Sequence, residues 1–207
     1  MINECLSLIN QLRGYMIYLV RHGQTDWNVE KKTQGHTDIP LNDIGREQAR
    51  SLSLDISKLG IDSIISSDLL RAKETAEIIN EANGVNLIFD QRLREINYGD
   101  LEGISRDNLK PETWDIFNVT PEKFNAEPFT DVFVRIKSLF DELSDKQENI
   151  LIVTHGGPLR MIMYYANNRD KFDKKEYALF SQNAKIKNAA VFGWEENLTS
   201  LRPISVD

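Results

Sequence analysis

Five side chains in this sequence are of the types that can transfer a phosphoryl group. They are Arg21, His22, Arg71, Glu95 and His155. A neutral imidazole attacks phosphorus when a hydrogen bond holds a proton on one ring nitrogen and the other nitrogen faces the substrate. His22, in an Arg-His-Gly tripeptide, is the candidate nucleophile. Arg21 and Arg71 are candidates for holding the phosphate, because a guanidinium presents a planar fork of donors to its oxygens.

Glu95 and His155 are expected to assist this transfer. Glu95 would protonate the leaving oxygen and later take a proton from water. His155 precedes a predicted helix, whose free N–H groups and dipole favour an anion, and we expect its imidazole to be a cation that adds to this field. The third histidine, His36, is expected to lie exposed in a loop, and Arg94 and Glu102 are expected to be solvated charges.

The histidines and the single cysteine do not form a metal-binding pattern. None of the three histidines pairs with another at the His-x-x-x-His spacing of a helical site, and Cys5 is near none of them in the sequence. We therefore expect no metal and no cofactor. A lone cysteine also excludes an intramolecular disulfide, which fits a protein of the reducing cytoplasm.

Short apolar runs and helical periodicity predict the elements that position these residues. Strands are predicted over residues 16–20, 61–66, 87–89, 149–153 and 189–194. Helices are predicted over residues 42–59, capped by Asn42, over 68–82, from Thr130 or Asp131 to 143, and over 156–165. Such alternation predicts an α/β fold, a three-layer α/β/α sandwich around a mainly parallel central sheet. Ligands bind beyond the carboxyl ends of such strands, where the candidate residues lie.

The domain organisation is predicted to be simple. Residues 16–207 are expected to form one catalytic domain. Residues 1–15 are expected to be an N-terminal extension, either an extra amphipathic turn or a start-site artefact. Residues 98–129 are polar and lack strong periodicity, which predicts a connecting lobe of the kind that sets substrate choice.

Composition restricts the partners. Lys and Arg number 25 against 32 Asp and Glu, a formal net charge of −7, so no broad cationic surface is available for nucleic acid. No apolar stretch approaches the roughly 20 residues of a membrane span. The expected partner is a small phosphorylated substrate, attracted by a few convergent arginines and histidines. The oligomeric state stays open.

Five ordered motifs resemble those of the histidine phosphatase superfamily, in its phosphoglycerate-mutase-like branch. The first reads Tyr-Leu-Val-Arg-His-Gly-Gln-Thr over residues 18–25, with Trp-Asn following at 27–28. The others are Gln-Gly at 34–35 with Asp-Ile-Pro-Leu at 38–41, the block at 66–76, the block at 93–103 and Val-Thr-His-Gly at 153–156. The resemblance runs from about residue 16 to about residue 191, and ordered blocks are far more specific than Arg-His-Gly alone.

The resemblance implies a phosphomonoesterase that acts through a phosphohistidine on His22, with Glu95 as general acid and base. It implies no metal. The phosphate pocket would be formed by Arg21, His22, Arg71 and His155, with a donor from Asn28. The other residues expected to contact substrate are Gln34, Gly35 and Gly156. Many relatives carry Gly-Glu-Ser where residues 127–132 read Glu-Pro-Phe-Thr-Asp-Val, so no substrate-binding serine is assigned there.

Two other functions remain open. A cofactor-dependent phosphoglycerate mutase would need water excluded and a cluster of cations for the substrate carboxylate. The short lobe offers only the scattered Arg106, Lys110 and Lys123. A non-catalytic module that binds a phosphorylated ligand is the third interpretation. The presence of every candidate catalytic residue speaks against it.

Overall fold

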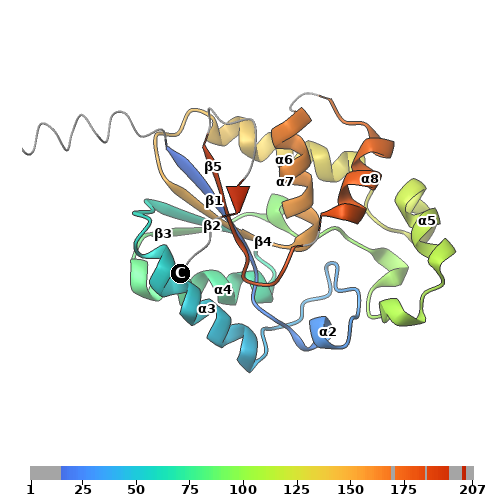
Figure 1. Cartoon of the computed structure of the whole chain (residues 1–207), viewed down its shortest axis with the longest axis horizontal. Coiled ribbons are helices and arrows are strands. Elements are labelled where there is room, and N and C mark those ends of the chain that lie inside the picture. Colours follow the sequence, from blue (N-terminus) through green and yellow to red (C-terminus); the bar gives the residue numbers. More distant parts are fainter. Residues whose placement is uncertain (1–14, 169–170, 185, 196–201, 204–207) are drawn as a thin grey trace, which may run out of the picture.

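A six-stranded sheet forms the centre of the fold, in the order β3-β2-β4-β1-β5-β6 (Figure 1). The computed structural model describes residues 15–168, 171–184, 186–195 and 202–203. The strands are β1 (Met16–Arg21), β2 (Ser63–Ser66), β3 (Asn86–Phe89), β4 (Ile150–Thr154), β5 (Val191–Glu195) and β6 (Arg202–Pro203). The first four are mutually parallel, whereas β5 is antiparallel to β1 and β6 to β5. The predicted mainly parallel sheet is confirmed.

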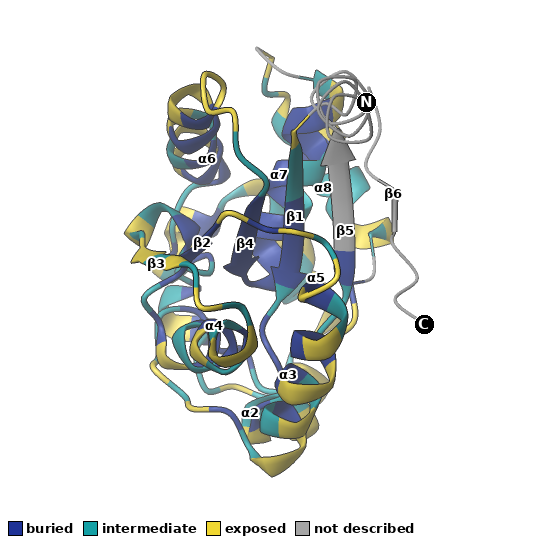
Figure 2. Cartoon of the chain, turned by 90° about the vertical axis from the view of Figure 1, so that its left-hand side faces the viewer, coloured by how far each residue is buried: buried dark blue, intermediate teal, exposed yellow. Residues whose placement is uncertain are grey.

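Helices cover both faces of this sheet, because successive strand residues point to opposite sides. One core contains Val20 and Val153 of the sheet and side chains of α3 (Asp43–Ile56) and α4 (Leu70–Asn83). The other contains Leu19 and Ile152 with side chains of α6 (Phe129–Leu143) and α7 (Gly156–Asn168). Figure 2 shows the buried strands β1, β2 and β4 in the middle of the molecule. The predicted three-layer α/β/α sandwich is therefore confirmed.

The connecting lobe is more ordered than its sequence predicted. It contains α5 (Pro111–Val119), which begins at a proline, and the short turns of 3₁₀ helix η2 (Gly99–Leu101), η3 (Arg106–Asn108) and η4 (Pro121–Phe124). Aromatic rings pack against one another within the lobe and join it to the core that contains Leu19 and Ile152. These rings belong to Tyr98, Trp114, Phe117, Phe124 and Phe129. The lobe also contacts α8 (Lys174–Asn183), a helix that the sequence analysis missed.

All four predicted helices differ from the observed ones at one end or both: α4 begins at Leu70 instead of residue 68 and ends one residue later, and α7 continues to Asn168 instead of ending at 165. The Asn42 side chain caps α3 by accepting from the N–H of Gly45, as predicted, but the helix ends at Ile56 instead of residue 59, and Ile44 is 59% exposed although it fits the apolar period. Helix α6 begins at Phe129, after Pro128, without a side-chain cap, so the cap predicted at Thr130 or Asp131 is wrong.

The remaining short elements are α2 (Asp26–Val29) and η1 (Gln91–Leu93). Residues 1–14 of the predicted extension lie outside the described residues. Within the described part of the chain, no helix is long and apolar enough to cross a membrane.

Candidate active site

The carboxyl ends of β1, β2 and β4 bring the two candidate histidines together. The N–H of His22 donates to the Thr154 carbonyl over 2.9 Å, and that of Ser67 donates to the Val153 carbonyl over 3.0 Å. These bonds extend the ladder one residue beyond the strands. The rings of His22 and His155 consequently lie 5.1 Å apart between centroids, with an angle of 56° between their planes.

His22 has the protonation that a nucleophile needs. Its side chain is 2% exposed, and Nδ1 lies 2.6 Å from the carbonyl oxygen of Gly23. A carbonyl only accepts, so Nδ1 carries the proton and Nε2 keeps its lone pair. Burial, followed by the charges of Arg71 and Arg21, holds the pKa of His22 well below its usual range. The imidazole is therefore neutral at neutral pH.

Arg71 is fully buried and held by three acceptors. Its terminal nitrogens donate to the carbonyls of Gly35 over 2.7 Å and Thr37 over 3.0 Å, and Nε donates to Nδ1 of His155 over 3.1 Å. Each terminal nitrogen carries two N–H groups, so both keep a donor for a phosphate oxygen. Gly35, expected to contact substrate, thus fixes Arg71 through its backbone.

His155 is neutral in the free protein, and the expectation that it is a cation is wrong for this state. Because Nδ1 accepts from Arg71, the ring proton must be on Nε2, which lies 2.8 Å from the hydroxyl oxygen of Ser67. Burial and the neighbouring Arg71 hold the pKa of His155 well below its usual range.

The side-chain carboxylate of Glu95 lies at the N-terminus of α7. Its Oε1 accepts from the N–H groups of Ile96 and Gly157, each over 2.9 Å. A Cβ on Gly157 would lie 2.2 Å from this oxygen, so only glycine permits the approach. The helix N-terminus that was expected to serve a ligand anion is therefore partly occupied by this carboxylate. Oε2 is the oxygen left to exchange a proton.

The backbone of Glu95 is also fixed. Its carbonyl accepts from Nε2 of His36 over 2.8 Å and from Arg135 over 3.3 Å. His36 is half-buried, so its prediction as an exposed loop residue is wrong.

Glu102 and Arg94 are likewise not free solvated charges. The carboxylate of Glu102 accepts from the N–H groups of His36, Thr37 and Tyr98 and from the Thr37 hydroxyl, over 2.6 to 3.1 Å. It thereby ties the loop that fixes Arg71 to the loop that carries Glu95. Arg94 forms a two-point ion pair with Asp68, over 2.7 and 2.5 Å.

Three further candidates are Arg21, Asn28 and Gln34. Arg21 donates to the Ile186 carbonyl over 2.6 Å, and burial lowers the pKa of Arg21 to about 10. Oδ1 of Asn28 accepts from the N–H of Thr25, so its amide N–H groups are what it can offer a ligand. The side-chain oxygen Oε1 of Gln34 is buried and has no hydrogen-bond partner among the described residues.

Asn188 was missed by the sequence analysis. Its Nδ2 is within hydrogen-bond distance of the carbonyls of His22 (3.1 Å) and Gly23 (3.2 Å) and of Oδ1 of Asn28 (3.1 Å). The segment before β5 reaches the site because β5 runs antiparallel and so begins at the edge where the parallel strands end. No motif signalled this residue.

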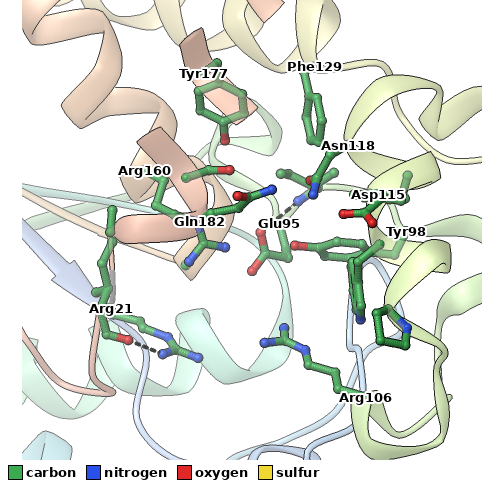
Figure 3. Close-up of a pocket in the computed structure, with 18 residues that line it drawn as sticks. Arg21, Glu95, Tyr98, Arg106, Asp115, Asn118, Phe129, Arg160, Tyr177 and Gln182 are labelled. Carbon is green, nitrogen blue, oxygen red and sulfur yellow. Dashed lines mark hydrogen bonds between the residues drawn. The ribbon is translucent and has the colours of Figure 1, made fainter. Parts of the chain in front are cut away.

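A cavity of about 670 Å³ opens beside these residues (Figure 3). Arg21, Glu95 and Gly156 form the wall that it shares with the site, whereas His22, Arg71 and His155 are not among its lining residues. Its other walls come from the lobe, α7 and α8, and include Tyr98, Arg106, Trp114, Asp115, Arg160, Tyr177 and Gln182. The phosphate end of a ligand and its remainder would therefore lie in separate compartments. Among the described residues, no group of three His, Cys, Asp or Glu side chains is placed to hold a metal ion.

Comparisons with known proteins identify the family. The family model "Histidine phosphatase superfamily (branch 1)" matches residues 17–201. "Probable phosphoglycerate mutase GpmB" of Escherichia coli O1:K1 is 40% identical over 151 residues, which cover 68% of this chain and 69% of that protein.

Solved structures are similar over nearly the whole chain. Mycobacterial glucosyl-3-phosphoglycerate phosphatase, in complex with VO3, is 27% identical and superposes with a TM-score of 0.78 over 92% of this chain and 97% of its own. The protein TTHB049 of Thermus thermophilus is 28% identical, with a TM-score of 0.66 over 91% of this chain and 98% of its own.

Proposed function

Because the chain belongs to branch 1 of the histidine phosphatase superfamily, we propose that it hydrolyses a small phosphomonoester through a phosphohistidine on His22. The observation that supports this most is the state of His22, a buried neutral imidazole whose Nδ1 proton is fixed by the Gly23 carbonyl. The lone pair on Nε2 is then available to attack phosphorus.

In the first step Nε2 of His22 forms a bond to phosphorus while the bond to the leaving oxygen breaks. Arg21 and Arg71 stabilise the charge on the non-bridging oxygens, and Asn28 adds a neutral donor. His155 accepts from Nε of Arg71 and so orients the guanidinium that binds these oxygens. Glu95 enters this step protonated on Oε2 and gives that proton to the leaving alkoxide. Gln34, Gly35 and Gly156 shape the pocket around the transferring group.

In the second step water attacks the phosphohistidine. The Glu95 carboxylate takes a proton from the water, the new P–O bond forms and the P–N bond breaks, which releases inorganic phosphate and restores neutral His22. Two in-line displacements give net retention at phosphorus. No metal or cofactor takes part.

A phosphoglycerate mutase is the second candidate, because relatives 40% identical to this chain carry that name. Hydrolysis is favoured by the cavity. Its volume of about 670 Å³ and its exposed lining residues Arg106, Asp115 and Gln182 leave room for water beside Glu95. A mutase must keep water from the phosphohistidine until the phosphoryl group returns to a hydroxyl.

The setting of the reaction is part of the proposal. Residues 16–207 act as one catalytic domain, preceded by an extension over residues 1–15. The protein works in the cytoplasm, on a small metabolite and without nucleic acid, which its net charge of −7 disfavours as a partner.

The deciding experiment measures phosphate release from a panel of phosphomonoesters without added metal, for the wild type and His22→Ala. We expect the variant to lose activity by on the order of 10³-fold or more. Arg50→Ala, an exposed change on α3, is the matched control. Isomerisation of 3-phosphoglycerate is followed in parallel. Isomerisation faster than hydrolysis would favour the mutase, and a wild type inactive in both assays would favour the binding module.

A further inference from the structure

The cavity contains two arginines that the proposed phosphoryl transfer does not use. Arg160 comes from α7 and Arg106 from η3, and both line the cavity next to Glu95. Arg160 did not stand out in the sequence, and Arg106 was considered only as one of the scattered cations of the lobe. Figure 3 shows both guanidinium groups directed into the space between Arg21, Glu95 and Tyr98.

Arg160 and Arg21 are close neighbours of like charge. The position that a Cβ of Gly156 would occupy lies 3.5 Å from a terminal nitrogen of Arg160 and 3.8 Å from Nε of Arg21. That Nε is buried and has no hydrogen-bond partner among the described residues. Two adjacent cations repel unless an anion lies between or beside them, and a buried donor without a partner is costly. Both observations point to an anionic ligand.

The protein neutralises these charges only in part, through the Glu95 carboxylate while it is ionised. Among the described residues, no carboxylate lies within 4.0 Å of the guanidinium of Arg160 or Arg106. Arg106 instead stacks on the ring of Trp114, with 5.7 Å between its central carbon and the ring centroid. This contact fixes the orientation of the fork without consuming its donors.

The rest of the lining suits an anion with an organic body. Burial raises the pKa of Tyr98 and of Tyr177, so both hydroxyls remain protonated donors. The charged lining residues are three arginines and two carboxylates, Glu95 and the exposed Asp115. Glu95 is uncharged when it acts as the acid, which leaves a positive balance in the first step.

We infer that Arg160 and Arg106 bind a second oxyanion, a carboxylate or a phosphoryl group, carried by the alcohol that leaves. The substrate class is then a phosphomonoester of an anionic alcohol. This inference rests on the proposed function, since it places the transferring phosphoryl group at His22. The aromatic wall and the volume of about 670 Å³ accommodate a leaving group larger than three carbons.

The test measures binding in the His22→Ala protein, which cannot form the phosphohistidine. Calorimetry compares three ligands on one scaffold, glycerol 3-phosphate, 3-phosphoglycerate and glycerol 1,3-bisphosphate, which carry a neutral group, a carboxylate and a second phosphoryl group. We expect at least one of the two doubly anionic ligands to bind about 10- to 100-fold more tightly than glycerol 3-phosphate, as charge-assisted hydrogen bonds do. Which one does so identifies the oxyanion.

Arg160→Gln, introduced into the His22→Ala protein, is expected to abolish the preference for the doubly anionic ligand. It is expected to leave the affinity for glycerol 3-phosphate within about 3-fold of that of His22→Ala. That unchanged affinity also shows that the variant is folded. Arg160→Lys is expected to restore part of the preference, because it keeps the charge but loses the fork. Arg106→Gln, an exposed change, is expected to weaken it less, and Arg50→Gln not at all.

Two results would overturn the inference. One is the absence of any preference for the doubly anionic ligands over glycerol 3-phosphate. The other is an equal loss of affinity for all three ligands in Arg160→Gln, which would assign Arg160 to the transferring phosphoryl group or to the fold. Failure of the proposed function is recognised separately, as a wild type that shows the binding preference but releases no phosphate.

Discussion

At the residue scale, the protonation of each histidine follows from one neighbour whose hydrogen-bonding role is fixed. A carbonyl cannot donate, so Gly23 places the proton of His22 on Nδ1. The guanidinium N–H of Arg71 cannot accept, so it keeps Nδ1 of His155 unprotonated. The two rings consequently carry their protons on opposite nitrogens. The proposed nucleophile, His22, therefore has the required protonation before any substrate binds.

The Glu95→Gln variant tests whether His22 attacks phosphorus while Glu95 supplies and removes protons. With p-nitrophenyl phosphate, whose leaving group needs little protonation, we expect a burst of about one equivalent of p-nitrophenolate followed by slow turnover, because the second step lacks its base. Alkyl phosphates are expected to lose about 10²- to 10⁴-fold in rate without a burst. Rapid-quench kinetics makes the measurement, and Glu112→Gln on the exposed side of α5 is the control. Equal losses for both substrate types, with no burst, would contradict the assignment.

The buried histidines also make stability depend on pH. Burial, with Arg71 next, holds the pKa of both His22 and His155 below the 6.5 of an exposed histidine. Below that pH the unfolded chain binds protons that the folded chain does not. The free energy of unfolding is therefore expected to fall as the pH drops from about 6.5, by up to about 1.4 kcal/mol per pH unit for each histidine.

Urea unfolding between about pH 7.5 and about pH 5.5 measures this slope. His155→Gln is expected to reduce it, whatever its effect on stability at neutral pH. Asp68, whose pKa the hydrogen bond from Arg94 lowers, titrates in a more acidic range and does not interfere. An unchanged slope in the variant would show that His155 is not held neutral by the fold.

At the scale of the elements, one loop connects Arg71, proposed to bind the phosphate, to Glu95, the proposed acid. Carbonyls of Gly35 and Thr37 hold Arg71, and Glu102 holds the backbone of the same loop. Gly35 has φ +55°, and a Cβ there would lie 1.8 Å from a Glu102 oxygen. This position therefore requires glycine for two independent reasons.

Gly35→Ala is expected to displace this loop and to lower kcat/KM by on the order of 10²-fold, because small misplacements of catalytic groups are that costly. Gly60→Ala is the matched control. Gly60 has a similar φ of +63°, but its Cβ would meet nothing within 4 Å. The Gly60→Ala variant should therefore lose about 1 kcal/mol of the free energy of unfolding but keep the wild-type kcat/KM. Steady-state kinetics with thermal unfolding distinguishes the two, and equal activities would refute the role of the loop.

The sequence predicted the elements whose pattern is local and missed those that depend on distant contacts. Strands β1 and β4 are mainly apolar runs, β2 has two adjacent isoleucines at its centre, and the capped helix α3 is strongly periodic, so both kinds were found. Helix α8 buries only Tyr177, so it has too little apolar pattern to be recognised. Helix α5 was missed for the same reason, because Phe117 is its only fully buried residue.

The same distinction applies to the candidate site. Parallel strands end at one edge, which made the convergence of His22 and His155 predictable from their positions after two strands. Arg160, Glu102 and Asn188 are ordinary surface residue types in the sequence. Their roles come from what tertiary packing places beside them. The charge of His155 was mispredicted because its partner Arg71 lies 84 residues away in the chain.

At the scale of the whole molecule, the two hydrophobic cores share one sheet. Val20 and Leu19 are adjacent in β1 yet belong to opposite cores. Loss of packing on one side therefore loosens strands that the other side needs, and the two layers should unfold together.

Ile79→Ala in α4 and Ile136→Ala in α6 test this coupling. Both side chains are fully buried, one in each core. Each variant is expected to lose about 2–5 kcal/mol of the free energy of unfolding. Circular dichroism and tryptophan fluorescence should nevertheless give one coincident transition. Two separated transitions in either variant would show that the layers fold independently.

The direction of β5 has a consequence for when the protein becomes active during its synthesis. The ribosome has made every proposed catalytic side chain once it passes His155. The carbonyl of Ile186 that anchors Arg21, and the Asn188 amide beside the nucleophile, emerge later. A nascent chain that already contains all the proposed catalytic residues thus still lacks the two contacts that orient Arg21 and His22. We therefore expect catalytic competence only after Ile186 and Asn188 have emerged and the segment before β5 has docked beside Arg21 and His22.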